Sequence, residues 1–551
     1  DLVELFEVAT EHFSERVALQ HHRAGGVVER YTYAELRDYA ERAGHLLESA
    51  GVRQDVPVLL ASENRPQWGM AYFGILEAGG VAVPVDPEST LEEFVNFVDS
   101  AHARAILLSN YVADRLREPL EERLRQEGLP AVVFSFDQLF TPALREASEA
   151  ADAAEMVDAA ADAEDWEPKR ALVEASDDGS RLASLIYTSG TTGEPKGVML
   201  SHHNFTSLLT NLKSVFDVDE SDGFVSVLPL HHTFEFTCGF LMPLSEGSTV
   251  TYLDELSGDE LISATTSNRA TALIGVPALW EMLHRQIRSR LASAHPAVGW
   301  VVDRLQEANR VLRDRTGVNL GKYLFGAVHR ALGGNLQYLI SGGAALSEDV
   351  LEGFYGLGFD LYEGYGLTEA APVLTVNRPD GRVTPGTVGE ALPEVEIEID
   401  EPGEDGVGEI VARGPNVMDG YLDREDETAE TLDDGWLRTG DLGRVDEEGN
   451  LRIVGRQKEV IVTSGGKNVY PDELEDFYGD HEHVDALSVV GLPDGSGSER
   501  VACLVRPAVP EDADSEEAAE IRSSVREWFR VQGPRAASHK RIQVLRLWDG
   551  E

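Results

Sequence analysis

The sequence predicts an α/β protein of layered α/β subdomains followed by a smaller β-rich subdomain. Up to about residue 384, short apolar runs of strand length alternate with helical patterns. Such alternation is typical of largely parallel sheets covered by helices. Beyond that point the runs VEIEID, GEIVARG, LRIVG and EVIVTSG are separated by turns, which predicts short strands. A length of 551 residues adds an expectation of roughly three to four domain-sized pieces.

The strands expected in the first part of the chain are apolar runs at 57–62, 81–85, 104–109, 183–189, 271–275 and 336–341. A helix is expected at 33–51 because Thr32 and Glu35 have the spacing of a capping box. Residues 143–181 are rich in Ala, Asp and Glu, and we expect a solvated helix or linker without chemistry. Residues 283–333 have helical periodicity, and predict either a helical decoration or the wall of a long apolar site.

Charge is the most unusual property of the composition. The chain has 47 Lys and Arg residues against 98 Asp and Glu, a net charge of −51. At molar salt the Debye length falls to about 3 Å, so the resulting repulsion is largely screened there. We therefore expect a halophilic source, with an ordinary acidic protein as the alternative. Nucleic-acid binding is disfavoured because phosphate backbones require basic surfaces.

The compartment is expected to be the cytoplasm. The chain begins DLVELFEVATEHF, without the basic and apolar regions of a secretory signal. Cys238 and Cys503 are too few for a disulfide framework, which favours a reducing setting. No apolar run reaches about 18 residues, so we expect no transmembrane segment.

The stretch YTSGTTGEPKG, Tyr187–Gly197, combines a predicted strand with closely spaced glycines, hydroxyls and one lysine. Such a loop can turn backbone N–H groups inward to bind an anion, with Lys196 as a point charge on a tight turn. A flexible linker is disfavoured because the loop begins on a strand and leads into an apolar-patterned helix, VMLSHHNFTSLLTNL. The spacing from Gly190 to Lys196 also differs from that of the P-loop.

Extended to YTSGTTGEPKGVMLSH, this stretch closely resembles the signature loop of the adenylate-forming (ANL) superfamily, which includes acyl-CoA synthetases, adenylation domains and luciferases. The resemblance implies a catalytic role for Lys196 and a metal-binding role for Thr191. It also implies a nucleotide-binding loop of Thr188, Ser189, Gly190, Thr191, Thr192 and Gly193.

A second match is SGGAALSEDVLEGFYGLGFDLYEGYGLTE, residues 341–369. The resemblance implies that Tyr365 stacks on adenine, Thr368 contacts the α-phosphate and Glu369 binds Mg²⁺. The further nucleotide-binding residues that it implies are Gly343, Ala344, Gly364 and Gly366. A carboxylate that holds Mg²⁺ suits ATP, because the metal neutralises charge as pyrophosphate leaves.

A third match is WLRTGDLGRVDEEGNLRIVGRQKEVIVTSGGKNVYPDELE, residues 436–475. By resemblance, Asp441 and Arg456 bind the ribose hydroxyls, for which a carboxylate is a natural acceptor. Lys458 stands where the family has its hinge. Gly465 and Gly466 match the loop that lines the CoA pantetheine tunnel. The resemblance thus divides the chain into an adenylation domain at 1–457, with its β-rich subdomain at about 384–457, and a small mobile α+β lid at 458–551.

The acyl pocket is indicated by a fourth match, LPLHHTFEFTCGFLMPLSEGSTV, which resembles a segment of the long-chain fatty acyl-CoA synthetases. His232 aligns with a residue near the substrate carboxylate, although a histidine there is more often a packed core residue. Phe234, Phe236 and Phe240 indicate an apolar channel, and residues 272–283 are expected to form another wall.

The resemblance implies a long-chain fatty acid–CoA ligase that uses ATP, Mg²⁺ and CoA and forms an acyl-adenylate. The alternatives are a ligase for another acid (medium-chain or aryl), an acyl-AMP ligase that loads a carrier protein, or a non-catalytic acyl- or nucleotide-binding regulator. Peripheral membrane contact and a homodimer both stay open, although the acidic composition argues against attraction to anionic lipids. Chain-length preference is not indicated.

The C-terminus departs from the family pattern. The family has a lysine near its C-terminus that reaches the substrate carboxylate during adenylation. The run SHKRIQVLRLW matches the segment that precedes this lysine, but the sequence ends at Glu551. Lys540 comes too early in the pattern to be assigned the role. We interpret the ending as a truncation, with a chain naturally impaired in adenylation as the alternative.

Overall fold

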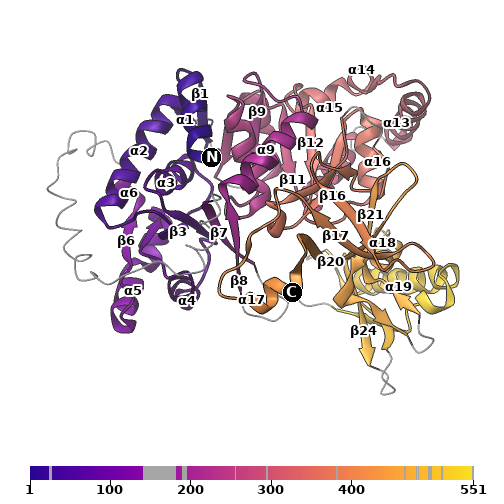
Figure 1. Ribbon diagram of the computed structural model, residues 1–551. Coiled ribbons are helices and arrows are strands. Elements are labelled where there is room, and N and C mark those ends of the chain that lie inside the picture. The colour runs from indigo at the N-terminus through magenta and orange to yellow at the C-terminus, as the bar shows by residue number, and fades with distance from the viewer. Residues whose placement is uncertain are drawn as a thin grey trace. The chain divides into compact units, whose positions relative to one another are not determined.

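The computed structural model describes residues 1–23, 26, 28–140, 181–188, 195–254, 256–292, 296–379, 383–463, 467–479, 481, 483–493, 499–510 and 513–548. The segment expected at 143–181 lies, apart from its last residue, outside them. The chain forms two compact units (Figure 1): Asp1–Glu396 with Arg413–Leu437, and Ile397–Ala412 with Arg438–Glu551. The predicted division at Lys458, between an adenylation domain and a mobile lid, stays a prediction.

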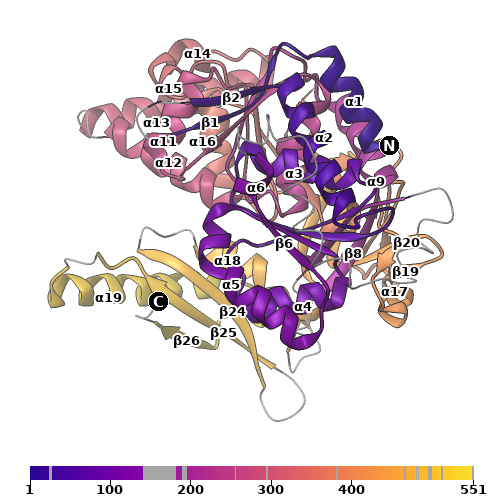
Figure 2. The same ribbon diagram turned by 90° about the vertical axis from the view of Figure 1, so that its left-hand side faces the viewer.

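The first unit contains a seven-stranded sheet with the order β18, β8, β7, β4, β3, β5, β6 among the described residues. Its strands are β3 (Pro57–Ala61), β4 (Val81–Val85), β5 (Ala105–Leu108), β6 (Val132–Ser135), β7 (Leu182–Thr188), β8 (Lys196–Ser201) and β18 (Gly420–Tyr421). All neighbours are parallel except β7 with β8 and β8 with β18. Helices α2 (Tyr33–Ser49), α3 (Pro66–Glu77) and α6 (Phe136–Phe140) lie on one face, and α4 (Leu91–Ala101) and α5 (Asn110–Glu127) on the other (Figure 2).

A nine-stranded sheet with the order β15, β14, β13, β12, β11, β9, β10, β1, β2 forms the other layer of this unit, counted over the same residues. Its strands are β1 (Val17–His22), β2 (Val28–Thr32), β9 (Gly223–Ser226), β10 (Thr249–Leu253), β11 (Ala272–Gly275), β12 (Tyr338–Ser341), β13 (Leu361–Gly366), β14 (Val373–Val376) and β15 (Glu390–Ala391). The strands from β13 to β1 are parallel, and antiparallel strands complete both edges.

Helices cover this second sheet. The remaining helices of the unit are α1 (Leu2–His12), α9 (His202–Val215), the π-helix η2 (Glu235–Leu241), α10 (Met242–Ser245), α11 (Gly258–Ser267), α12 (Pro277–Ala292), α13 (Pro296–Thr316), α14 (Gly321–Leu324), α15 (Gly326–Ala331), α16 (Glu348–Leu357), η3 (Thr368–Ala370) and α17 (Glu425–Thr431). Buried side chains of α11, α12, α15 and α16 form one core with β9, β11, β12 and β13.

Local sequence explains where these helices begin and how closely they pack. The predicted capping box before α2 is present, with the Thr32 side chain accepting from the Glu35 backbone and the Glu35 side chain accepting from Thr32. Helices α2 and α3 cross at Gly44 and Gly74. A Cβ atom at Gly74 would lie 2.6 Å from the Cβ of Ala43, so the close crossing requires glycine there.

The second unit, as far as the structure describes it, is built from strands of two to ten residues and the helices α18 and α19, with three 3-10 helices. Its elements are β16 (Glu396–Asp400), β17 (Gly408–Arg413), β20 (Trp436–Val445), β21 (Leu451–Arg456), η4 (Gln457–Glu459), β22 (Ile461–Val462), β23 (Asn468–Val469), α18 (Pro471–Gly479), β24 (Val484–Pro493), β25 (Glu499–Pro507), α19 (Ser515–Gln532), η5 (Gly533–Arg535), η6 (Ser538–Lys540) and β26 (Val544–Leu547). The short β19 (Leu432–Asp433) pairs with the first residues of β20. A core around Tyr478, Val501 and Val525 joins α18, β25 and α19.

The predicted fold class is confirmed, and each expected strand lies on a strand of the structure. One expectation is wrong: residues 196–201 do not begin a helix and do not hold Lys196 on a tight turn. They form β8, which pairs antiparallel with β7 from Thr188–Lys196 to Leu182–Ser201. The helix α9 begins only at His202, where the Ser201 side chain caps it. None of the described helices has the length and apolarity that would let it span a membrane.

Candidate active site

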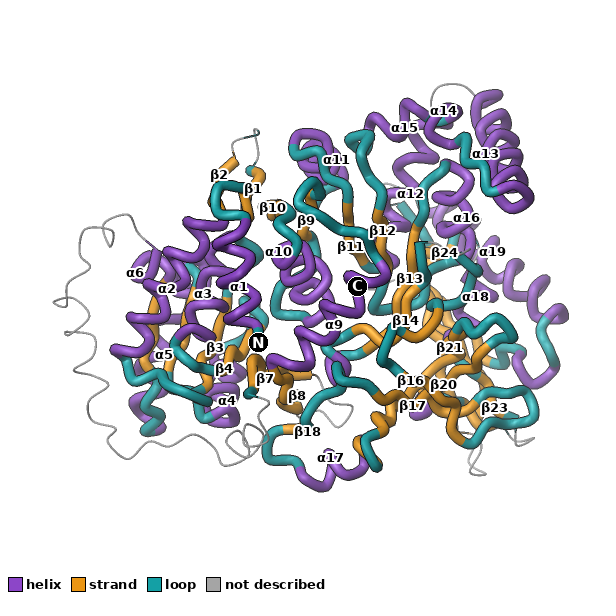
Figure 3. The backbone as a smooth tube through the Cα atoms, turned by 45° about the horizontal axis from the view of Figure 1, so that its top comes forward, coloured by secondary structure: helices purple, strands orange, loops and turns teal. Residues whose placement is uncertain are grey.

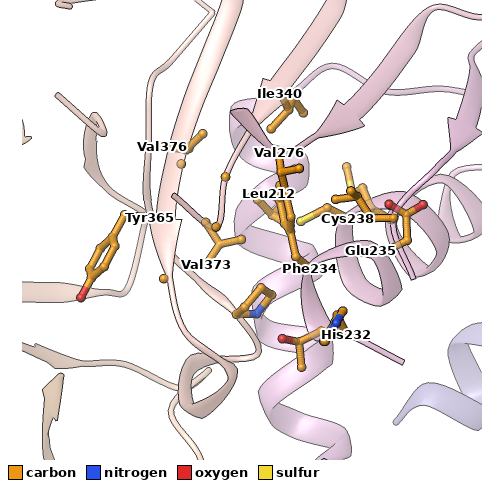
Figure 4. Close-up of a pocket in the computed structure, with 18 of the residues that line it drawn as sticks. Leu212, His232, Phe234, Glu235, Cys238, Val276, Ile340, Tyr365, Val373 and Val376 are labelled. Carbon is orange, nitrogen blue, oxygen red and sulfur yellow. The ribbon is translucent and has the colours of Figure 1, made fainter. Parts of the chain in front are cut away.

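An apolar cavity of about 400 Å³ lies in the first unit, beside the carboxyl ends of β9, β11, β12 and β13. This edge of a parallel sheet is where α/β proteins commonly bind ligands. The apolar side chains around it (Figure 4) include Leu212, Phe234, Cys238, Val276, Ile340 and Val376. A cavity of this size and composition is suited to an apolar small molecule.

The π-helix η2 shapes one wall of the cavity, and π-turns occur often at functional sites. Phe234, just before η2, packs against Gly342, where a Cβ atom would lie 2.9 Å from the phenyl ring. Phe236 and Phe240 do not line the cavity, contrary to expectation. They are buried against α3, with the Phe236 ring centroid 4.5 Å from that of Tyr72, because η2 turns them towards that helix.

Two adjacent histidines precede η2. Their ring centroids lie 4.3 Å apart, and His232 lines the cavity as expected. Burial, followed by the neighbouring His232 ring, lowers the pKa of His231 to about 4. Burial also lowers the pKa of His232, against the opposing influence of Asp86. Both imidazoles are therefore neutral at pH 7, so His232 can donate or accept a hydrogen bond without adding a charge.

Glu235 also belongs to this wall, and it is fully buried, with an exposed fraction of 0%. Burial raises its pKa to about 8, against the weaker opposing influence of the nearby Ser226 side chain and Leu228 backbone. Figure 4 shows the carboxyl group pointing away from Leu212 and Val276. Glu235 thus carries a proton near neutral pH, which keeps this wall uncharged.

A polar cluster joins residues from three distant parts of the chain. The Tyr421 hydroxyl donates to Glu369 Oε1 at 2.7 Å, and Lys196 Nζ lies 4.9 Å from the centroid of the Tyr421 ring. Lys196 Nζ is also 3.9 Å from Glu427 Oε2. The β18–β8 pairing explains the meeting, because it sets Tyr421 opposite Val198 on the strand that Lys196 begins. The predicted catalytic residues Lys196 and Glu369 are thereby brought to one place.

The predicted nucleotide residues that follow β12, or lie in β13 or just after it, are beside the cavity, except Ala344. Gly343, Gly364, Tyr365, Gly366 and Thr368 all line it, whereas Ala344 is exposed and does not. Figure 4 shows Tyr365 well apart from Phe234 and Cys238. A Cβ atom at Gly366 would lie 1.8 Å from the Pro372 carbonyl oxygen, so only glycine fits this turn.

Of the other predicted residues, Thr188 lies in the first unit, three lie in the second unit and seven lie outside the described residues. Asp441 and Arg456 are partners on β20 and β21, with Arg456 Nε 3.4 Å from Asp441 Oδ1. Lys458 lies in η4. Thr188 ends β7 opposite Lys196. Ser189, Gly190, Thr191, Thr192, Gly193, Gly465 and Gly466 lie outside the described residues.

The described residues contain no group of three or more His, Cys, Asp or Glu side chains that could hold a metal ion alone. Mg²⁺ in nucleotide sites usually takes one or two carboxylates together with phosphate oxygens. Glu369 fits that pattern, because its carboxylate is only half-buried and the Tyr421 hydroxyl orients one of its oxygens. Sequence reasoning missed Tyr421 and Glu235. An acidic residue within the apolar run FEFTCGF was a usable signal for Glu235, but Tyr421 had none.

A family model described as AMP-binding enzyme matches residues 6–422, so the chain belongs to that family. It is 30% identical over 541 residues to a long-chain-fatty-acid–CoA ligase of Salmonella typhimurium, covering 93% of this chain and 87% of the relative. It is 29% identical over 501 residues to the 3-[(3aS,4S,7aS)-7a-methyl-1,5-dioxo-octahydro-1H-inden-4-yl]propanoyl:CoA ligase of Rhodococcus jostii, covering 87% of this chain and 85% of that one.

Among solved structures, ATP-bound MatB from Rhodopseudomonas palustris superposes with a TM-score of 0.74 at 26% identity, over 100% of this chain and 95% of MatB. The family and these relatives confirm the predicted superfamily and the predicted class, the AMP-forming acyl-CoA synthetases.

Proposed function

We propose that this protein is a long-chain fatty acid–CoA ligase, which converts ATP, a fatty acid and CoA into acyl-CoA, AMP and pyrophosphate. The observation that carries the proposal is the apolar cavity, which extends from His232 and Thr368 to Ile340 and Val376. A fatty acid has one polar end and a long apolar body. Each buried CH₂ group contributes about 0.8 kcal/mol, so an apolar cavity selects such a chain over smaller acids. The ligase of Salmonella typhimurium supports this substrate class.

The residues around the cavity suit the first step, in which the fatty-acid carboxylate attacks the ATP α-phosphate and pyrophosphate leaves. His232, neutral and beside the cavity, would hold the carboxylate without a competing charge. Thr368 would donate to the α-phosphate and Tyr365 would stack on adenine, with Gly343, Gly364 and Gly366 admitting the nucleotide. Lys196 would stabilise negative charge on the phosphates. Magnesium held by Glu369, with Thr191 as the predicted second ligand, would neutralise phosphate charge when bound.

In the second step the CoA thiol attacks the acyl carbon, a C–S bond forms and AMP leaves. Asp441 and Arg456 are proposed to bind the ribose, and Gly465 and Gly466 to admit the pantetheine arm. Lys458 is proposed as the hinge of a C-terminal lid at 458–551 that moves between the steps. Because the protein forms no covalent bond to substrate in this scheme, its contribution is positioning and charge stabilisation.

A ligase for another carboxylic acid is the second candidate. The relative from Rhodococcus jostii is named for a bicyclic propanoyl substrate, and it matches this chain almost as closely as the Salmonella relative does. The cavity wall also contains Thr233 and the phenol-bearing Tyr338, which a substrate with an oxygen on its apolar body could contact.

The test is an assay of AMP and thioester formation with Mg-ATP in molar KCl, with and without CoA. The acids are a saturated series from short to long chains, an aryl acid and a bicyclic propanoic acid. We expect CoA-dependent AMP release with an optimum among long chains. An optimum at the aryl or bicyclic acid would replace the long-chain assignment with the second candidate. Acyl-AMP without thioester would indicate a carrier-protein acceptor. No turnover with any acid, while ATP still binds, would contradict the ligase and favour a regulator.

A further inference from the structure

The helices α12 to α15 form a basic region in a strongly acidic protein. Residues 283–333 contain nine of the 47 Lys and Arg residues of the chain, but only three of its 98 Asp and Glu residues. Helices α13 and α14 lie side by side at one end of the first unit in Figures 1 and 3. None of these residues lines the apolar cavity. The expectation that they form a wall or rim is therefore wrong for this cavity, and they form a helical decoration of the first unit instead.

Some of these cations have acidic partners, and others do not. Arg290 pairs with Asp259, Arg310 with Glu307 and Glu352, and Arg313 with Asp360. The remaining six cations are all exposed, and none forms an ion pair with another residue in the described parts of the chain. They are Arg285, Arg288, Arg304, Arg315, Lys322 and Arg330.

Helix α13 has one face packed on α16 and one face exposed. Asn309 donates to the Gly356 carbonyl and Gln306 to that of Gly353, which directs their side of the helix inward. The opposite face has Trp300, exposed by 65%, and Val311, exposed by 36%. Arg304 lies over the Trp300 ring, 5.7 Å from its centroid, one turn along the same face. Positions 300, 304, 311 and 315 share this face at the helical period.

The apolar surface continues past the end of α13. Val318 is 48% exposed, and Tyr323 on α14 is 87% exposed beside the exposed Lys322. The acids Asp303, Glu307 and Asp314 are also exposed on this side of α13, so the positive charge belongs to residues 283–333 as a whole, with nine cations against three acids. An exposed tryptophan and an exposed tyrosine in such a region form an unusual combination in a chain of net charge −51. We call Trp300, Arg304, Val311, Arg315, Lys322 and Tyr323 the α13–α14 face.

We propose that the α13–α14 face docks the protein on an anionic lipid surface. Indole and phenol rings prefer the headgroup level of a bilayer, where one end is apolar and the other is wet. Arginine and lysine extend their charged ends to lipid phosphates while their stems cover apolar surface. The acidic residues that dominate elsewhere are repelled by the same lipids. This repulsion would orient the protein with the α13–α14 face towards the lipid surface. This proposal departs from the expectation that acidity opposes lipid attraction, because the charge is unevenly distributed along the chain.

The test is co-sedimentation with vesicles of phosphatidylcholine alone and of phosphatidylcholine with phosphatidylglycerol, without ATP or fatty acid. The variants are Trp300→Ser/Tyr323→Ser and Arg304→Glu/Arg315→Glu. Tyr111→Ser on α5 and Arg526→Glu on α19 are matched controls, since Tyr111 is 51% exposed and Arg526 is exposed. We expect the wild type and both controls to bind the anionic vesicles, and each double variant to bind about tenfold more weakly or worse.

Other outcomes would overturn the proposal. Equal binding to both vesicle types, no binding of the wild type, or an equal loss in the control variants would each contradict an anionic-lipid site at this face. A dimer in sedimentation velocity that both double variants dissociate would assign the face to a second copy of the chain. Thermal unfolding of each variant verifies its fold, and the charge variant replaces only exposed side chains. Because binding is measured without turnover, the result is independent of the proposed ligase activity.

Discussion

The wall of the apolar cavity and the α13–α14 face use similar side chains in opposite ways. Around η2 the rings of Phe236 and Phe240 are buried, that of Phe234 is half-buried beside the cavity, and the nearby ionisable groups are neutral. Burial raises the pKa of Glu235 to about 8 and lowers that of His231 to about 4. On the α13–α14 face the rings of Trp300 and Tyr323 and the three cations are exposed. Burial, rather than residue type, thus decides whether an ionisable group contributes a charge to its surroundings.

The largest effect that we expect concerns the polar cluster beside the cavity, which is proposed to support turnover, whereas the α13–α14 face is not. Glu369→Gln removes the carboxylate that the Tyr421 hydroxyl orients, and with it the proposed ligand for Mg²⁺. We expect AMP formation to fall about 10²- to 10³-fold, as happens when a group that stabilises transition-state charge is lost. Glu425→Gln in α17, where the carboxylate is exposed, is the matched control and should keep wild-type activity. Equal activity of the two variants would remove Glu369 from the proposed site.

A second prediction concerns the buried acid of the cavity wall. The folded-state pKa of Glu235 is about 8, against an ordinary value of 4.5, so folded protein holds a proton that unfolded chains lack between these values. The contribution of Glu235 to the free energy of unfolding should therefore fall as pH rises from 4.5 to 8. The stabilisation from the proton is complete below pH 4.5 and is lost as pH passes 8. The total is on the order of a few kcal/mol, since one pKa unit corresponds to about 1.4 kcal/mol.

Glu235→Gln keeps the shape of the side chain and removes this titration. Urea unfolding of wild type and variant between pH 4.5 and 8 measures the difference, in which the titrations of His231 and other groups cancel. We expect the variant to gain stability relative to wild type as pH rises. Parallel curves would mean that Glu235 is not held neutral. A matching substitution of the exposed Glu425 should leave the slope unchanged.

The strands could be predicted from the sequence, because apolar runs bounded by turn residues depend only on local spacing. The site was predictable where its residues are adjacent in the chain, as with Gly364, Tyr365, Gly366 and Thr368. Contacts between distant segments could not be predicted in this way. Tyr421 is 52 positions from Glu369, and only the β18–β8 pairing brings it there.

Two other expectations were wrong because of local geometry. Residues 196–201 have the apolar pattern of either a strand or a buried helix turn, and the pairing with β7 decides for the strand. Phe236 and Phe240 were expected in the cavity because aromatic residues clustered there. The π-helical turn of η2 changes which residues share a face, so both rings pack on α3 instead.

Salt should separate the two regions further. We propose that the acidic composition reflects adaptation to a salty cytoplasm. Raising KCl from low to molar concentration would then raise the melting temperature by about 5–10 °C, because screening relieves repulsion among carboxylates. The same change should weaken vesicle binding through the α13–α14 face, where screening removes attraction. Calorimetry and co-sedimentation over one KCl series measure both. A melting temperature that does not change with KCl would contradict the adaptation to salt.

The smallest effect that we expect comes from a Val→Phe substitution made once in the cavity wall and once near the α13–α14 face. Val276→Phe places a ring in the cavity, which should lower kcat/KM for the longest acids about tenfold and leave short acids nearly unaffected. Val318→Phe places the same ring on a surface that is 48% exposed, and should leave the chain-length profile unchanged. The added ring should instead strengthen vesicle binding slightly, because it adds apolar area beside the α13–α14 face. A uniform loss over all chain lengths in Val276→Phe would mean that the acyl chain does not enter the cavity beside β11.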